Sequence, residues 1–158
     1  MTAERTLILD LLADYGALLD HGNYAAWLEL FAPECTYNVV PRENFERGLP
    51  VGLIYCDSRA MLEDRIMALL EANKYNIHTD RHLIGLPRLS SNNGLGADGL
   101  AIEAPFAVYQ TDQEGATRLF ATGLYKDRLE RTGATLKIRN KLVLLDTFAV
   151  PTLLATPL

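Results

Sequence analysis

The fold class is best predicted from residues 102–145, which read IEAPFAVYQTDQEGATRLFATGLYKDRLERTGATLKIRNKLVLL. Over 102–108 the apolar residues Ile, Ala, Phe and Val recur at every second position, and this period of two predicts a strand with one buried face. A Gly-containing turn at 112–115 then leads to a long strand over 117–130, and a second one at 131–134 leads to a strand over 135–145. Because no helical pattern interrupts these strands, they predict an antiparallel meander rather than parallel βαβ units.

Helical periodicity precedes the meander. From Thr6 to about Asp20 apolar residues recur at helical spacing opposite Asp10 and Asp14, and Gly22 is suited to a left-handed cap at the end of this helix. Asn23 is placed to cap a second, short helix. The residues on one face of that short helix are Tyr24, Trp27, Leu28 and Phe31.

A third helix is expected after Asp57 and Ser58, which offer its cap, with its end near Asn73. Its expected buried stripe is Met61, Leu62, Ile66, Leu69 and Leu70. Shorter strands are predicted at 35–40, ended by Pro41, and at 81–86. The remaining connections are a loop with Gly48, Pro50 and Gly52 and a hairpin connection over 90–99.

Helices first and a meander after them predict the α+β class, with a curved antiparallel sheet wrapped around the N-terminal helices. The chain has 158 residues, 22% charged and 49% hydrophobic, so residues 1–158 are expected to form a single domain. Such a cone is able to hold a ligand. Two classes of function therefore stay open: a small-molecule enzyme or binder, and an assembly subunit with a filled cone.

Charge and targeting signals exclude several partners. The formal net charge is −5 and no basic cluster is longer than two residues, so nucleic acid is not expected as a partner. The N-terminus lacks signal-peptide features, and no apolar run approaches the roughly 18 residues of a membrane span. Only two cysteines occur, Cys35 and Cys56, fewer than a secreted scaffold normally carries. We therefore expect a cytoplasmic protein without membrane contact.

Catalytic and metal-binding motifs are sparse. His78 and His82 are four residues apart, but an extended backbone separates them by about 13 Å, too far for one metal ion. His82 is able to act as a general base together with Asp14 or Tyr15, or to be a structural histidine at the core edge. Neither cysteine has a second Cys or His near it in the sequence, and the chain has no P-loop or dinucleotide fingerprint.

Arginines stand out in the polar segments between residues 41 and 82. Alternating charges of this kind are usually a solvated face. Arginine is nevertheless preferred over lysine where ion pairs are partly buried or span an interface. The candidate partner-interface residues are Arg42, Arg47, Arg59, Arg65 and Arg81.

The same segments resemble a known family. Residues 42–50 (RENFERGLP), 56–65 (CDSRAMLEDR), 72–75 (ANKY), 81–85 (RHLIG) and the tail from Asp146 are similar to the small (β) subunit of Rieske non-haem iron aromatic-ring-hydroxylating oxygenases. The resemblance extends from about Tyr15 to the end of the sequence. Among these subunits, the chain is more similar to those acting on benzoate-like acids such as salicylate, terephthalate or anthranilate.

The resemblance implies the cone of nuclear transport factor 2 (the NTF2-like fold) and a non-catalytic, structural role. It implies a large α subunit that carries the Rieske [2Fe–2S] cluster and the mononuclear iron, an α3β3 hexamer, and an indirect link to a ferredoxin or reductase. No catalytic, cofactor-binding or metal-binding residue is then expected in this chain. The alternative is a stand-alone isomerase-like or dehydratase-like enzyme that uses His82 with Asp14 or Tyr15.

Overall fold

The computed structural model describes residues 2–71, 77–90, 99–147, 149–151 and 153–158. The elements follow one another as α1 (Ala3–Asp20), α2 (Tyr24–Leu28), β1 (Phe31–Pro41), α3 (Arg42–Glu46), β2 (Ile54–Cys56), α4 (Arg59–Glu71), β3 (His78–Ile84), β4 (Arg88–Leu89), β5 (Gly99–Asp112), β6 (Thr117–Thr132) and β7 (Thr135–Leu145). This order confirms the α+β class, with helices first and the meander β5–β6–β7 last.

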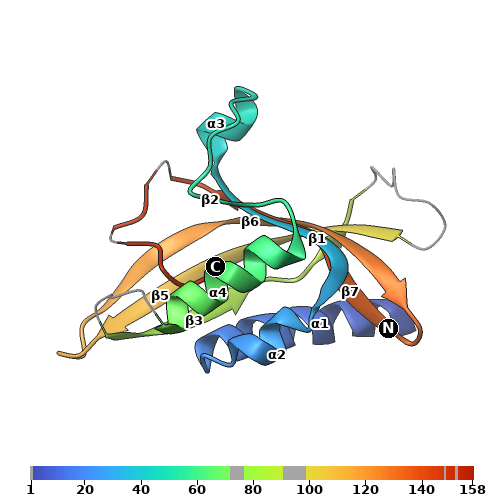
Figure 1. Cartoon of the computed structure of the whole chain (residues 1–158), viewed down its shortest axis with the longest axis horizontal. Helices are drawn as coiled ribbons and strands as arrows, with labels where there is room; N and C mark the ends of the chain where they lie inside the picture. The colour runs from blue at the N-terminus through green and yellow to red at the C-terminus, as the bar shows by residue number, and fades with distance from the viewer. Residues whose placement is uncertain (1, 72–76, 91–98, 148, 152) are drawn as a thin grey trace.

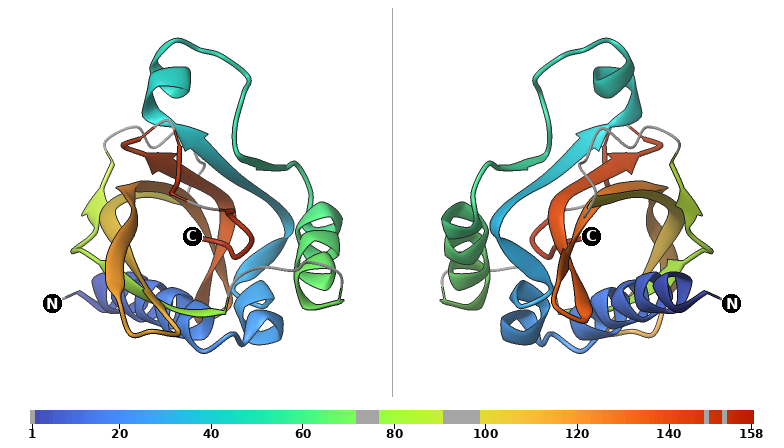
Figure 2. Two further views of the ribbon diagram at one scale, coloured as in Figure 1. Left: turned by 90° about the vertical axis from the view of Figure 1, so that its left-hand side faces the viewer. Right: turned by 90° about the vertical axis from the view of Figure 1, so that its right-hand side faces the viewer.

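The seven strands found in the described residues belong to one sheet with the order β2-β1-β7-β6-β5-β3, and β4 pairs with β5. Pairing is antiparallel except between β1 and β7, which run parallel with Tyr37 opposite Lys141. The sheet curls strongly, and α1 and α2 close its open side (Figures 1 and 2). The cone expected from the sequence is therefore present.

In the part of the chain that the structure describes, one buried cluster fills the cone. Inward residues of the meander contribute Ile102, Phe106, Val108, Tyr125 and Leu129 to it, with the period of two expected for a half-buried strand. From α1, Ile8, Leu11, Leu12, Tyr15 and Leu19 pack against them. The described part of the tail also enters the core, through Ala155 and Leu158.

The caps expected from the sequence are present. The Asn23 side chain accepts a hydrogen bond from the backbone N–H of Ala26, and the Ser58 hydroxyl accepts one from that of Met61. Gly22 has a φ of 66°, a left-handed conformation that suits the end of α1. The first helix starts earlier than expected, at Ala3, because the hydroxyl of Thr2 caps it.

Several boundaries differ from expectation. Phe31 does not belong to the short helix but begins β1, where its ring packs into the core. Met61 and Leu70 of α4 are exposed, so the buried stripe is narrower than expected: Leu62, Ile66 and Leu69. The loop expected after Pro41 instead contains α3 and leads to β2. The predicted helix end near Asn73 and most of the predicted connection over 90–99 lie outside the described residues.

Candidate functional site

Aromatic rings line the interior of the cone. Tyr15 on α1 lies 5.6 Å, centroid to centroid, from both Trp27 and Tyr125. Trp27 in turn meets Phe31 edge to face at 4.8 Å. These side chains are almost completely buried, so aromatic packing occupies the space that a ligand-binding cone would leave open.

A buried ion pair crosses this interior. Lys141 Nζ on β7 lies 2.9 Å from Asp127 Oδ2 on β6, and neither side chain is exposed. The ammonium also faces the Tyr125 ring at 3.5 Å and the Tyr15 ring at 4.0 Å from the centroids. Burial raises the pKa of Asp127 and lowers the pKa of Lys141, while each charge opposes the shift of the other.

The described end of the tail lies inside the cone (Figure 2), where Ala155 and Leu158 are buried. The Leu158 carbonyl accepts hydrogen bonds from the hydroxyls of Tyr15 at 2.6 Å and Tyr37 at 3.2 Å, and the Leu158 backbone N–H donates to Tyr37 Oη at 2.9 Å. Burial raises the pKa of both phenols, which keeps them protonated. The tail thus satisfies the polar groups that would otherwise be available to a ligand in the cone.

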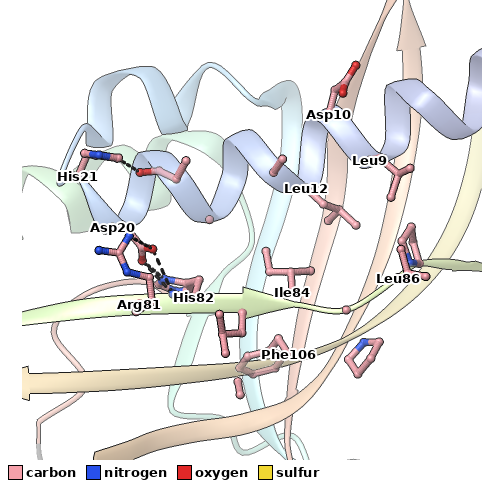
Figure 3. A pocket seen from close by; sticks show the side chains of 18 residues that line it. Leu9, Asp10, Leu12, Asp20, His21, Arg81, His82, Ile84, Leu86 and Phe106 are labelled. Atoms are coloured by element: carbon pink, nitrogen blue, oxygen red, sulfur yellow. Dashed lines mark hydrogen bonds and ion pairs between the residues drawn. The ribbon is translucent and has the colours of Figure 1, made fainter. Parts of the chain in front are cut away.

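His82 lies at the rim of the cone beside α1 (Figure 3). Its Nδ1 is 2.6 Å from Asp20 Oδ1, and its backbone N–H donates to the same carboxylate at 3.0 Å. Because a carboxylate only accepts, Nδ1 carries the proton. The Arg81 guanidinium donates to Asp20 Oδ2 at 3.2 Å.

The observed partner of His82 differs from Asp14 and Tyr15, the partners expected from the sequence. The carboxylate partner of His82 is Asp20, one helical turn and a half beyond the proposed Asp14, which is exposed. The hydroxyl of Tyr15, the other proposed partner, bonds to Leu158 instead. The carboxylate beside His82 was missed because Asp20 ends α1, and its direction depends on how the helix crosses β3.

The five candidate arginines fall into two groups. Arg59 donates to the carbonyls of Leu28 and Phe31 and pairs with Glu29 and Glu63. Arg65 donates to the Leu154 carbonyl at 3.2 Å and so holds the tail. Both therefore act within the chain.

The side chains of the other three arginines are more exposed to solvent than that of Arg59. Arg42 pairs with Asp146, and Arg47 pairs with Glu43 at 2.9 Å while 67% of its side chain stays exposed. The Arg81 side chain is 61% exposed although it contacts Asp20. Arg42, Arg47 and Arg81 therefore expose 42%, 67% and 61% of their side chains, which is surface available to a partner.

Asp127 and Lys141 were not singled out in the sequence. The signal was present, because Asp127 stands at an inward position between Tyr125 and Leu129 in a strand of period two. The inward position of Lys141 is harder to predict, because the alternation of β7 is interrupted between Ile138 and Lys141, where the register of β6 and β7 shifts. A charged residue in the buried phase of each of two adjacent strands predicts a buried pair.

The side chains that the structure describes do not fit an iron centre. Cys35 and Cys56 are buried free thiols, and desolvation raises the pKa of each. No group of three or more His, Cys, Asp or Glu side chains that could hold a metal ion occurs in the part of the chain that the structure describes. Among the same residues, no helix is long and apolar enough to cross a membrane.

The fold places the chain in the NTF2-like class of α+β cones. A structure described as a scytalone dehydratase of Novosphingobium aromaticivorans has a TM-score of 0.70 and covers 98% of this chain and 91% of its own, at 12% identity. At that identity the likeness concerns the fold alone.

Closer relatives define the family. Residues 16–152 match the model of the ring hydroxylating β subunit. The chain is 39% identical to the anthranilate 1,2-dioxygenase small subunit of Burkholderia cepacia (89% of this chain, 85% of the relative). It is 34% identical to a terephthalate 1,2-dioxygenase β subunit of Comamonas sp. (92% and 93%). A structure described as the β subunit of an aromatic-ring-hydroxylating dioxygenase of N. aromaticivorans is 39% identical, with a TM-score of 0.87 over 98% and 97% of the chains.

The chain therefore belongs to the β-subunit family of ring-hydroxylating dioxygenases. Membership confirms the family resemblance and implies a large α subunit as a partner. In this family the cofactors are carried by the α subunit.

Proposed function

We propose that this chain is a non-catalytic subunit that assembles the terminal oxygenase of an aromatic-acid hydroxylating system. The observation that carries the proposal is the filled cone: Lys141, Asp127, the tyrosines and Leu158 occupy the interior and satisfy one another there. An interior of this kind supports a structural role, because substrate would have to displace well-packed and hydrogen-bonded groups.

The relatives support an acidic aromatic substrate for the whole complex. Anthranilate and terephthalate both carry a carboxylate on a benzene ring, and two relatives of this chain are named for them. We propose an α3β3 complex whose α subunits hold the Rieske cluster and the mononuclear iron and receive electrons through a ferredoxin or reductase. We also propose that residues 1–158 form one domain, supported by the single core cluster, and that the buried thiols fit a reducing cytoplasm.

The first test is purification of the tagged chain from its native host, with measurement of subunit composition, native mass and visible absorption. A larger, brown, iron–sulfur-containing partner in equal amount is the expected result. A colourless chain that purifies without a larger subunit would contradict the proposal.

The interface arginines give a sharper test. We propose that Arg42, Arg47 and Arg81 contact neighbouring subunits directly, while Arg59 and Arg65 hold the surfaces that do so. Arg81→Glu is expected to reduce recovery of the large subunit at least tenfold without changing the thermal midpoint of the isolated chain by more than about 4 °C. Arg88→Glu, an exposed arginine outside the set, is the matched control. Equal recovery from both variants would remove Arg81 from the interface.

A stand-alone enzyme remains the second candidate because Asp20 fixes the tautomer of His82 beside a groove. This candidate requires turnover or tight small-ligand binding by the isolated chain, lost in His82→Ala. Isothermal titration of the isolated chain with anthranilate and terephthalate separates the two candidates. The assembly proposal expects no heat of binding from either compound.

A further inference from the structure

Two tyrosine hydroxyls converge on one carbonyl oxygen inside the cone. Tyr15 Oη from α1 and Tyr37 Oη from β1 donate to the Leu158 carbonyl at 2.6 and 3.2 Å. Neither tyrosine is exposed, and burial raises the pKa of both phenols, so both remain protonated donors. Donors that are fixed in place and shielded from water bind an acceptor oxygen more strongly than donors in solvent do.

The segment that supplies this oxygen is separate from the walls of the cone. The tail segment, residues 153–158, forms neither helix nor strand and leads into the ring of strands (Figure 2). Along its length, Arg65 donates to the Leu154 carbonyl at 3.2 Å and the Thr156 hydroxyl donates to Asp80 at 3.1 Å. The acceptor between the phenols thus comes from an inserted segment and not from the helix and strand that form the site.

The tail segment leaves other polar groups of the interior without a partner. Tyr125 Oη and Trp27 Nε1 are buried and have no hydrogen-bond partner among the described residues. Both rings lie 5.6 Å from the Tyr15 ring, centroid to centroid. A buried donor without an acceptor is unfavourable. The tail segment therefore satisfies the interior incompletely, and a ligand with an acceptor oxygen finds donors that are still unused.

The charges of the interior favour an uncharged ligand. Lys141 Nζ faces the Tyr15 ring at 4.0 Å and is already paired with Asp127 at 2.9 Å. A carboxylate buried there would need a cation of its own, whereas a ketone or aldehyde needs only hydrogen-bond donors. The rings of Trp27 and Phe31, which pack beside the two phenols, offer an apolar surface to the body of such a ligand.

We propose that the cone contains a latent binding site for an uncharged carbonyl compound with an apolar body, and that the tail segment occupies this site as a built-in competitor. The hydroxyls of Tyr15 and Tyr37 bind the carbonyl oxygen of either occupant, so the tail segment and a ligand exclude each other. Because the site lies within one chain, it is tested without the large subunit, and the proposed assembly role does not depend on the outcome.

The test compares the same substitution at two positions of the tail segment in the full chain. Leu158 is 1% exposed and Leu153 is 62% exposed. Leu158→Asp places a charge in the apolar interior and should expel the tail segment, whereas Leu153→Asp should leave it seated. In isothermal titration, Leu158→Asp is expected to bind acetophenone more tightly than the unmodified chain or Leu153→Asp does, by a factor of at least about ten.

Ethylbenzene, which has a similar shape but no carbonyl oxygen, separates carbonyl recognition from cavity filling. Tyr15→Phe and Tyr37→Phe, each combined with Leu158→Asp, should weaken acetophenone binding about fivefold and leave ethylbenzene binding unchanged. Infrared difference spectra give a second readout. The carbonyl stretch of bound acetophenone should lie at or below its frequency in water, whereas a bound probe without hydrogen bonds would show its frequency in hexane.

Circular dichroism checks that each variant is folded. Leu158→Gly, which removes the buried side chain without adding a charge, takes the place of Leu158→Asp if that variant does not fold. Equal acetophenone binding by the unmodified chain and by the Leu158 variant would show that the tail segment is no competitor and would overturn the proposal. A folded Leu158 variant that binds no acetophenone, or that binds ethylbenzene equally well, would overturn the carbonyl site.

Discussion

Gly123 lies where β6 and β7 approach closely. A Cβ atom at this position would meet the Leu144 carbonyl oxygen at 2.0 Å, so Gly123→Ala forces two backbones apart. We expect the free energy of unfolding to fall by about 3 kcal/mol, the upper part of the usual range for overpacking. Urea denaturation monitored by Trp27 fluorescence measures this change.

Gly16 provides the matched control. A Cβ there would lie 3.3 Å from His82 Cβ and Ile84 Cδ1, which are side-chain atoms, and alanine favours a helix interior by about 1 kcal/mol over glycine. Gly16→Ala should therefore change the unfolding free energy by less than about 1 kcal/mol. If Gly123→Ala changed the unfolding free energy as little as Gly16→Ala, the close approach at Gly123 would not constrain the fold.

Asp127 and Lys141 test how a buried charge pair is tolerated. Lys141→Met leaves the Asp127 carboxyl buried without its cation, and we expect a loss of about 3–5 kcal/mol. The double variant Asp127→Leu/Lys141→Met should be more stable than Lys141→Met, because no charge is left buried. Urea denaturation of the single and double variants gives the coupling energy, and strictly additive losses would contradict a direct interaction.

The free energy of unfolding of the Lys141→Met variant should increase as the pH falls. Burial raises the pKa of Asp127, and removing the cation removes the main opposing effect. The folded state then binds a proton more tightly than the unfolded state, so stability is gained as pH falls from 7 towards about 4. A series of urea titrations over this range should show a steeper rise than in the unmodified chain.

At the scale of elements, Arg59 ties α4 to α2 and β1. Its guanidinium donates to the carbonyls of Leu28 and Phe31 at 3.1 and 3.0 Å. Arg59→Met should lower the unfolding free energy by about 2 kcal/mol, because both bonds are charge-assisted and partly buried. Arg47→Met removes only an exposed pair and should cost less than about 0.5 kcal/mol. Thermal unfolding of both variants checks the difference, which equal losses would refute.

Helices and strands with local sequence signals were predictable from the sequence. The bounds of β7 agree with expectation, and the caps of α2 and α4 are in place, because periodicity and capping act within a few residues. The spacing of Phe31 from Tyr24 and Trp27 predicts a helix, yet pairing of β1 with β7 draws Phe31 into a strand. Helical spacing predicts that Met61 and Leu70 are buried, but both are exposed because only a narrow face of α4 contacts β1.

At the scale of the whole molecule, both thiols are enclosed. Cys35 and Cys56 are each less than 5% exposed, and desolvation raises both pKa values, so little thiolate forms at neutral pH. Ellman's reagent should react with neither thiol in the native chain within minutes and with both in 6 M guanidinium chloride. Rapid reaction of one thiol in the native state would show that β1 and β2 open locally.

Residue spacing, local capping and motifs were sufficient to predict the α+β class, the order of helices before the meander, the caps of α2 and α4, and the family resemblance. These features depend on residue spacing and on local hydrogen bonds, which a linear reading preserves. The tertiary fold alone brings Asp20 to His82, pairs Lys141 with Asp127 between tyrosine rings, and places Leu158 inside the cone. Each of those contacts joins residues distant in sequence or depends on strand register, and the parallel β1–β7 pairing and the curl of the sheet bring them together.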